Sequence, residues 1–192
     1  MAKEDAVLVG VGGQGILLAS EILAQTAIIS GHRVKTNETH GMAQRGGSVI
    51  AHVRYGDAVH SPMVTEGRAN VLASFEKIEA LRYAHYLASD GVAVVSTQQI
   101  IPVSVSSGQA TYPEDADERL DAVFGKRLLK IDAIEIARAV GNSKAANVAL
   151  MGAVSMQLSL PLKAWEEAIA ECVPEQFREL NLEAFRKGRD SV

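Results

Sequence analysis

Apolar and polar positions along the start of the chain predict strands and helices in turn. The short apolar run 6–11 ends in glycines, which is typical of a strand buried on both faces. Apolar residues then recur at helical spacing from Gly15 to about Ser30, and Gly31 ends that helix because glycine tolerates a positive φ. A second short strand is predicted at 33–37. This β–α–β order favours a parallel sheet with helical crossovers.

The next segment departs from that pattern. Residues 38–47 are polar and rich in glycine, and they predict a loop. In 48–55 apolar residues occupy alternate positions, which predicts a strand with one buried face. Gly56-Asp57 is a turn signal, and the residues around Val59 are expected to pair back as a hairpin. The sheet is therefore expected to have a mixed edge.

Strand and helix signals alternate again beyond this edge. The further predicted elements are strands at 70–75, 92–96, 102–106 and 128–131, helices at 78–88, 133–140 and 145–158, and a surface loop at 107–117. Pro161 suits the first turn of another helix. That helix carries one apolar stripe, made of Leu162, Trp165, Ile169 and Cys172. A last helix carries Phe177, Leu180, Ala184 and Phe185.

Together these elements predict an α/β fold with three layers, α/β/α. Its sheet is mostly parallel and Rossmann-like, with a mixed edge, and the C-terminal part is helical. A chain of 192 residues is the usual length of one domain and buries a full core. Since no internal repeat, linker or low-complexity tract interrupts it, residues 1–192 are expected to form a single domain.

Composition narrows the classes of function. The net charge of −4, the lack of a basic stripe and the 5% of aromatic residues argue against nucleic-acid binding. No run approaches the roughly 18 apolar residues of a membrane span, and the start lacks a secretory pattern, so a soluble cytoplasmic protein is expected. Cys172 is the single cysteine, so the chain cannot hold an iron–sulfur cluster with its own thiolates.

The glycine-rich segment Gly10-Val11-Gly12-Gly13-Gln14-Gly15 fits the G-x-G-x-x-G pattern between a strand and a helix. Glycines let the backbone approach a ligand closely, and the N–H groups at the helix start favour an anion. The same glycines also suit a tight turn with no ligand. A dinucleotide site would need an acidic residue at the tip of the second strand, and Glu38, 23 positions after Gly15, has a tolerable spacing.

A second polar segment, Asn37 to Ser48, follows the second predicted strand and is expected at the same carboxyl edge of the sheet. His40 has a side chain that titrates near neutral pH. Arg45 is suited to holding a carboxylate or phosphate with two hydrogen bonds. Gly46-Gly47 permits close approach of a backbone. Contact with a partner subunit and a solvated surface charge remain alternatives for Arg45.

These motifs resemble one family. Gly10 to Gly15, followed by His40-Gly41-Met42-Ala43-Gln44-Arg45-Gly46-Gly47-Ser48, is similar to the gamma-type domain of the pyruvate/ketoisovalerate family of 2-oxoacid:ferredoxin oxidoreductases. The sequence from His40 to Gly47 is most similar to that of the indolepyruvate branch of the family. Asn147-Val148-Ala149-Leu150-Met151-Gly152 resembles the family's Asn-x-x-x-x-Gly at the start of a late helix. The matches span most of the chain.

The resemblance implies a division of labour. In such enzymes thiamine diphosphate decarboxylates the 2-oxoacid, iron–sulfur clusters pass electrons to ferredoxin, and coenzyme A takes the acyl group. The family holds thiamine diphosphate through magnesium with Gly-Asp-Gly and an Asn pair, whereas this chain has only Ser89-Asp90-Gly91, which is interpreted as a turn. A large (alpha) partner subunit is therefore expected to carry the thiamine diphosphate, magnesium and clusters.

The expected role of the chain is a subunit of an indolepyruvate:ferredoxin oxidoreductase, inactive when isolated, with coenzyme A as a candidate ligand. Ferredoxin is an indirect partner, and contacts between copies of the chain are also considered. No catalytic or metal-ligating residue is assigned. The candidate cofactor-binding residues are Gly10, Gly12, Gly13, Gln14, Gly15, Asn37, Glu38, His40, Gln44, Arg45, Gly46 and Asn147. The alternatives are a stand-alone dinucleotide-binding reductase and a non-enzymatic nucleotide-binding module.

Overall fold

The computed structural model describes residues 3–40, 46–101, 105 and 111–192. Its sheet has the strand order β2-β3-β1-β4-β5-β6. The strands are β1 (Glu4–Val11), β2 (Arg33–His40), β3 (Ser48–Gly56), β4 (Ala69–Ser74), β5 (Leu87–Ser96) and β6 (Leu128–Ile131). β1, β4, β5 and β6 are parallel, so most of the sheet is parallel as predicted.

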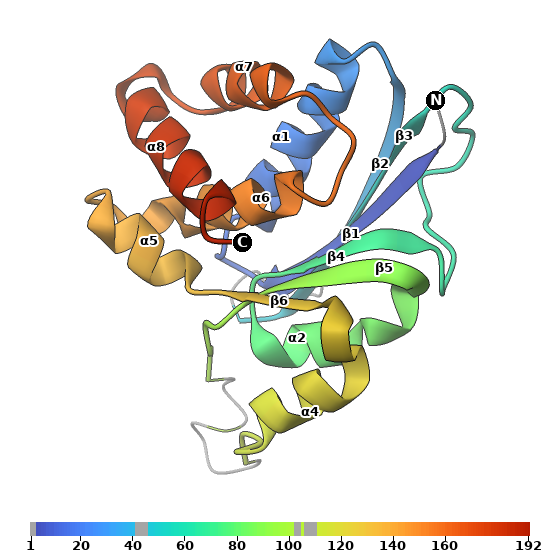
Figure 1. Cartoon of the computed structure of the whole chain (residues 1–192), viewed down its shortest axis with the longest axis vertical. Coiled ribbons are helices and arrows are strands. Elements are labelled where there is room, and N and C mark those ends of the chain that lie inside the picture. The colour runs from blue at the N-terminus through green and yellow to red at the C-terminus, as the bar shows by residue number, and fades with distance from the viewer. Residues whose placement is uncertain (1–2, 41–45, 102–104, 106–110) are drawn as a thin grey trace.

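Helices cover both faces of this sheet (Figure 1). The α-helices are α1 (Ile16–Ile29), α2 (Lys77–Arg82), α4 (Ala116–Phe124), α5 (Ala133–Ala139), α6 (Ala146–Ser155), α7 (Leu162–Cys172) and α8 (Arg178–Arg189). α1 and the helices from α5 onward lie on one face, and α2 and α4 lie on the other. The predicted three-layer α/β fold with a helical C-terminal part is confirmed.

The alternation of side chains along β1 explains the two cores. Ala6 and Leu8 point into the core under α1 and α6, whereas Val7 and Val9 point into the core under α2 and α4. All four are fully buried, which is why this strand is apolar at every position rather than at alternate ones. β1 therefore lies at the centre of the molecule, and its carboxyl end carries the glycine loop.

The mixed edge is confirmed, but its pairing differs from the prediction. β3 is antiparallel to β1 on one side and to β2 on the other, with His40 opposite Val49. The expected hairpin between β3 and the residues around Val59 does not form, because both sides of β3 are already paired. β1 and β2 point the same way, yet β3 lies between them, so the predicted β–α–β opening is not a pair of adjacent strands.

Three further boundaries need correction. The helix predicted at 78–88 ends at Arg82, and β5 begins at Leu87, so Ser89-Asp90-Gly91 lies in a strand and is not a turn. That end of β5 is irregular, because its register against β4 shifts between Ala69 and Val71. Helix α4 was not predicted. Most of the strand expected at 102–106 falls outside the described residues, as do residues 107–110 of the predicted loop, and the last two residues of that loop belong to α4.

The C-terminal helices pack closely against one another. Trp165 of α7 and Phe185 of α8 stack with ring centroids 5.7 Å apart. Trp165 and Ile169 of the predicted apolar stripe are fully buried in the core, Cys172 is partly buried, and Leu162 is exposed. Between α6 and α8 a Cβ at Gly152 would lie 2.1 Å from Phe185 O, and one at Gly188 would lie 1.9 Å from Ala149 O. This contact fixes α6. Among the helices of the described chain, none is long and apolar enough to cross a membrane.

Candidate functional site

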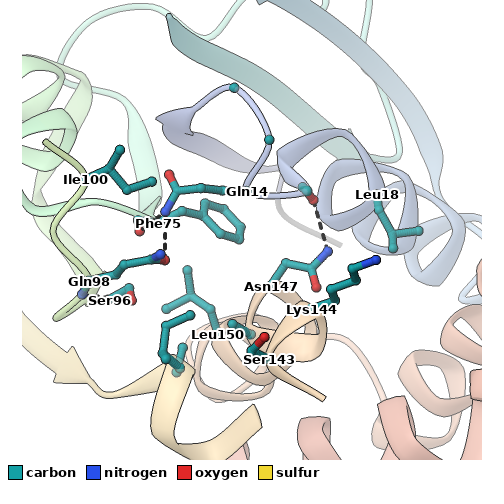
Figure 2. Close-up of a pocket in the computed structure, with 16 residues that line it drawn as sticks. Gln14, Leu18, Phe75, Ser96, Gln98, Ile100, Ser143, Lys144, Asn147 and Leu150 are labelled. Carbon is teal, nitrogen blue, oxygen red and sulfur yellow. Dashed lines mark hydrogen bonds between the residues drawn. The ribbon is translucent and has the colours of Figure 1, made fainter. Parts of the chain in front are cut away.

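A cavity of about 610 Å³ opens at the carboxyl ends of β1, β4, β5 and β6 (Figure 2). α1 leaves β1 on one face of the sheet, and α2 leaves β4 on the other, so the cavity lies where the helices change sides. Its walls are Gly12, Gly13, Gln14, Gly15, Leu18, Phe75, Ser96, Gln98, Ile100, Ala133, Ile134, Ser143, Lys144, Ala146, Asn147 and Leu150. Ligands of open α/β sheets bind in this position.

The glycine loop needs glycine for its backbone at two positions. Gly13 and Gly15 have φ values of 104° and 77°, a region that side chains with a Cβ rarely adopt. Gly12 is not among the residues with positive φ, so the backbone requirement for glycine in this loop lies at Gly13 and Gly15. The loop therefore brings bare backbone to the cavity wall.

Gln14 ties the loop to the neighbouring strand ends. Its Oε1 accepts a hydrogen bond from Val11 N (2.7 Å), and its Nε2 donates to Phe75 O (2.6 Å) and to Gln98 Oε1 (2.9 Å). Figure 2 shows both bonds from Nε2. Gly10 makes room for this side chain, because a Cβ there would lie 2.8 Å from Gln14 Oε1. Both donors of the amide are thus engaged in holding the cavity together.

Asn147 holds the other end of the loop. Its Nδ2 donates to Gly15 O (3.1 Å), as Figure 2 shows, and its Oδ1 accepts from Val148 N (2.9 Å). A Cβ at Gly15 would lie 2.4 Å from Asn147 Nδ2. The predicted motif therefore has two parts: Asn147 fixes the glycine loop, and Gly152 lets α6 approach α8.

The start of α1 is electrostatically open toward the cavity. Ala19 N donates the first bond of the helix, to Gly15 O (3.1 Å), so the N–H groups of residues 16–18 have no carbonyl partner within it. Among the described residues no side chain caps this end, and its first turn carries no acidic residue. Lys144 lies beside Asn147 with its side chain extending toward Leu18 (Figure 2). The positive end of α1 and Lys144 favour an anion.

Lys144 also has no acidic partner in the part of the chain that the structure describes. A second hollow of about 280 Å³ shares Leu18, Lys144 and Asn147 with the cavity, and it reaches Pro174 and Phe177. The ring of Phe177 is 40% exposed. The cavity, with Lys144 in its wall, thus adjoins a hollow that reaches an exposed aromatic ring.

The second glycine segment meets the first directly. Gly12 N donates to Gly47 O (2.8 Å), and Gly46 N donates to Gly12 O (3.4 Å). The predicted meeting of the two glycine segments at one sheet edge is confirmed. Gly46 has a φ of 78°, consistent with its position in a turn before β3. Gln44 and Arg45 lie outside the described residues.

Asn37 and Glu38 are not among the residues that line the cavity. Asn37 and Glu38 belong to β2, which β3 separates from β1. Glu38 accepts a hydrogen bond from Ser20 Oγ of α1, and Asn37 Oδ1 accepts from Thr39 Oγ1 (3.3 Å). His40 is the last residue of β2, not part of a loop. An acidic residue for a dinucleotide ribose is therefore absent from this described wall.

Sequence reasoning missed Gln98 and Lys144. Gln98 follows β5 at the same edge as Gln14, so its place after a strand was an available signal. Lys144 lies in a 3₁₀ turn, Ser143–Ala145, directly before α6. The only sequence feature that pointed to Lys144 was its nearness to Asn147 in the chain. Such nearness does not predict a position beside a loop that lies more than 100 residues away in the sequence.

The chain's own residues do not fit thiamine diphosphate or an iron–sulfur cluster. Asp90 lies near the amino end of β5, beside Lys3 and Asp5, at the edge opposite the glycine loop. Burial, and then the charges of Glu21 and Glu171, raise the pKa of the Cys172 thiol to about 11, which disfavours the thiolate that ligates metals. No step of either cofactor is therefore assigned to these residues.

Comparison with known proteins identifies the family. The model of the family described as pyruvate ferredoxin/flavodoxin oxidoreductase matches residues 5–191. The chain belongs to this family. Indolepyruvate oxidoreductase subunit IorB of Thermococcus kodakarensis is 42% identical over 192 residues, which cover 98% of this chain and 95% of that protein. The family resemblance predicted from the two glycine segments and Asn147 is confirmed, as is the role of an oxidoreductase subunit.

Two solved structures share the fold of this chain. The gamma subunit of the keto/oxoacid ferredoxin oxidoreductase from Geobacter sulfurreducens has a TM-score of 0.71 at 24% identity and covers 98% of this chain and 97% of its own. The 2-oxoglutarate:ferredoxin oxidoreductase from Magnetococcus marinus, solved with 2-oxoglutarate, coenzyme A and succinyl-CoA, has a TM-score of 0.72 at 17% identity. It covers all of this chain, which corresponds to 31% of that longer one.

Proposed function

We propose that this chain is the small subunit of an indolepyruvate:ferredoxin oxidoreductase and that its carboxyl-edge cavity binds the diphosphate end of coenzyme A. The relatives named indolepyruvate oxidoreductase subunit IorB support the first part. A large subunit carries thiamine diphosphate, magnesium and iron–sulfur clusters, and passes electrons to ferredoxin. The two chains assemble in the cytoplasm.

The cavity is the observation that carries the second part. Three features together attract a diphosphate: bare backbone at Gly13 and Gly15, the positive end of α1, and Lys144, which has no acidic partner among the described residues. The adjoining hollow with the exposed Phe177 gives room for a ligand longer than a simple anion and for a flat ring. Coenzyme A combines a diphosphate with an adenine ring, and a coenzyme A complex of a structural neighbour supports this choice.

The test uses the enzyme reconstituted with its large subunit. Replacing Lys144 by alanine is expected to raise the KM for coenzyme A by about tenfold, because a charge-assisted contact to phosphate is lost. The KM for indolepyruvate and the amount of assembled complex are expected to stay unchanged. An unchanged KM for coenzyme A would contradict the proposed ligand.

Lys126 provides the matched control. It is an exposed lysine in the short 3₁₀ turn before β6, at the amino edge of the sheet. Lys126→Ala removes the same charge from the same subunit far from the cavity. If both variants raise the KM for coenzyme A equally, the effect is long-range electrostatics rather than contact at the cavity.

A further inference from the structure

A buried carboxylate, Glu76, lies directly behind the cavity without lining it. Its side chain is 1% exposed, and it follows Phe75, whose side chain forms part of the cavity wall. Glu76 Oε2 accepts from Ile78 N (2.6 Å) and Glu79 N (3.1 Å), so this oxygen caps α2. Ser74 Oγ donates to Glu76 O (2.6 Å) and fixes its backbone.

The other oxygen of Glu76 faces a different segment. Oε1 accepts from Tyr112 Oη (2.7 Å) and from Ile100 N (3.4 Å). Ile100 lines the cavity. One carboxylate therefore joins the start of α2 to the segment that follows β5, and four donors offset the cost of burying it. An exposed capping residue would satisfy α2 alone, so the burial of this side chain is explained by its second set of bonds.

Gln14 holds the segment that follows β5 from the side of the glycine loop. Gln14 Nε2 donates to Gln98 Oε1 (2.9 Å), and Lys77 N donates to Gln98 O (3.4 Å). Gln98 and Ile100 thus form a short stretch of cavity wall that is bonded to the glycine loop at one end and to Glu76 at the other. This wall faces Asn147 across the cavity, as Figure 2 shows.

We propose that Glu76 is a positioning residue for the coenzyme A site, because through Ile100 and Tyr112 it sets the distance between the wall at Gln98 and the glycine loop. This inference rests on the proposed function of the cavity. It predicts that loosening one bond to Glu76 weakens coenzyme A binding although no residue in contact with the ligand has changed.

Tyr112→Phe is the sharpest variant, because it removes one donor to Glu76 and leaves the cap of α2 intact. In the assembled two-subunit enzyme its KM for coenzyme A is expected to rise by about fivefold, with kcat and the KM for indolepyruvate unchanged. Tyr55→Phe is the matched control. The Tyr55 hydroxyl also donates to a carboxylate, that of Glu4, but at the amino edge of the sheet. Tyr55→Phe is expected to leave the KM for coenzyme A unchanged.

Hydrogen exchange gives a readout that does not depend on turnover. The amide of Ile100 is expected to exchange faster in Tyr112→Phe and in Glu76→Gln than in the parent complex, and at the parent rate in Tyr55→Phe. Unchanged exchange at Ile100 in Tyr112→Phe would overturn the inference.

The kinetic arms separate this inference from the proposed function. If Lys144→Ala raises the KM for coenzyme A and Tyr112→Phe does not, Glu76 does not position the site, and the proposed function stands. If Tyr55→Phe raises that KM as much as Tyr112→Phe, the effect is a general loss of stability, and the inference also fails. If neither Lys144→Ala nor Tyr112→Phe changes the KM, both proposals are wrong.

Discussion

The two edges of the sheet each carry a hollow of about 610 Å³, but their chemistry differs. At the amino edge the buried charge is neutralised. Asp5, which is 2% exposed, binds Arg54 Nε at 2.9 Å and Lys3 Nζ at 3.0 Å. At the carboxyl edge, amides and backbone groups form the cross-links, and Lys144 has no acidic partner within the described residues. Charges that are paired stabilise the fold, whereas donors that remain free are available to a ligand.

Arg54→Met should give the largest effect and should act on stability alone. The nearly buried carboxylate of Asp5 would keep only Lys3 as a charged partner, so the free energy of unfolding should fall by about 3 kcal/mol. Urea unfolding of the isolated chain measures this change. The KM for coenzyme A of the assembled enzyme should not move.

Arg68→Met is the control for this prediction. Arg68 is an exposed arginine lining the same amino-edge hollow, so its loss should change the free energy of unfolding by less than about 0.5 kcal/mol. Equal decreases in the free energy of unfolding from Arg54→Met and Arg68→Met would show that the buried ion pair has no special role. The contrast between the two edges of the sheet would then fail.

Gly15→Ala and Gly31→Ala test the two ends of α1. Both glycines have a positive φ, 77° and 83°, so each alanine should cost about 1 kcal/mol of backbone strain. The space around Gly31 is open, whereas a Cβ at Gly15 meets Asn147 Nδ2 at 2.4 Å. Gly15→Ala should therefore cost about 2 kcal/mol more, because Asn147 must leave the Gly15 carbonyl.

Thermal unfolding of the two variants measures this difference. Asn147→Ala should cost much less stability in the Gly15→Ala background than in the parent, since Gly15→Ala has already broken the bond that Asn147 makes. Simple additivity of Gly15→Ala and Asn147→Ala would argue against the contact as the cause.

Substitution of His52 should have the smallest effect on the free energy of unfolding, and this effect depends on pH. This side chain of β3 lies midway between the edges and is 1% exposed. Burial, and then the charge of Arg54, lower its pKa below 6.5. The unfolded chain takes up this proton at a higher pH than the folded chain. Neutral His52 therefore contributes to the free energy of unfolding. This contribution is fully present above about pH 6.5 and is lost as the pH falls through the pKa of His52 in the folded chain.

His52→Gln should therefore lose less stability than the parent chain when the pH falls from about 7 to about 5. Urea unfolding at a series of pH values measures this difference. His60→Gln, which changes an exposed histidine, should follow the parent curve. If His52→Gln follows it too, protonation of His52 is not what weakens the fold in acid.

Local sequence patterns predicted where the helices and strands lie better than they predicted which strands are neighbours in the sheet. β1 and α1 follow from an apolar run, a glycine loop and helical spacing, all within 30 residues. The insertion of β3 between β1 and β2 depends on pairing between distant segments, which a local pattern does not encode. α4 carries Ala116, Leu120 and Phe124 at intervals of four, but four of its nine residues are charged, and they obscured that apolar stripe. The start of β5 contains Ser-Asp-Gly, which imitates a turn.

The residues of the candidate site show the same contrast between local and long-range information. Gly12, Gly13, Gln14 and Gly15 were predicted because the motif is contiguous, and Asn147 followed from the family resemblance. Gln98 and Lys144 have no motif of their own, and only the fold brings them to the cavity. Glu38 fits a spacing rule for adjacent parallel strands, and that rule fails here because β3 separates its strand from β1.

The bond between Asn147 and the Gly15 carbonyl has a consequence for the order of folding. It joins residues 132 positions apart, and the apolar face of α1 is likewise covered by α6 and α7, which follow in the last third of the chain. During synthesis the glycine loop leaves the ribosome first, yet its anchor arrives only after the whole sheet. Contacts of such long sequence separation form late, because a large loop must close before they give any stability. A nascent or C-terminally truncated chain would thus contain every strand of the sheet but lack the residue that anchors the glycine loop.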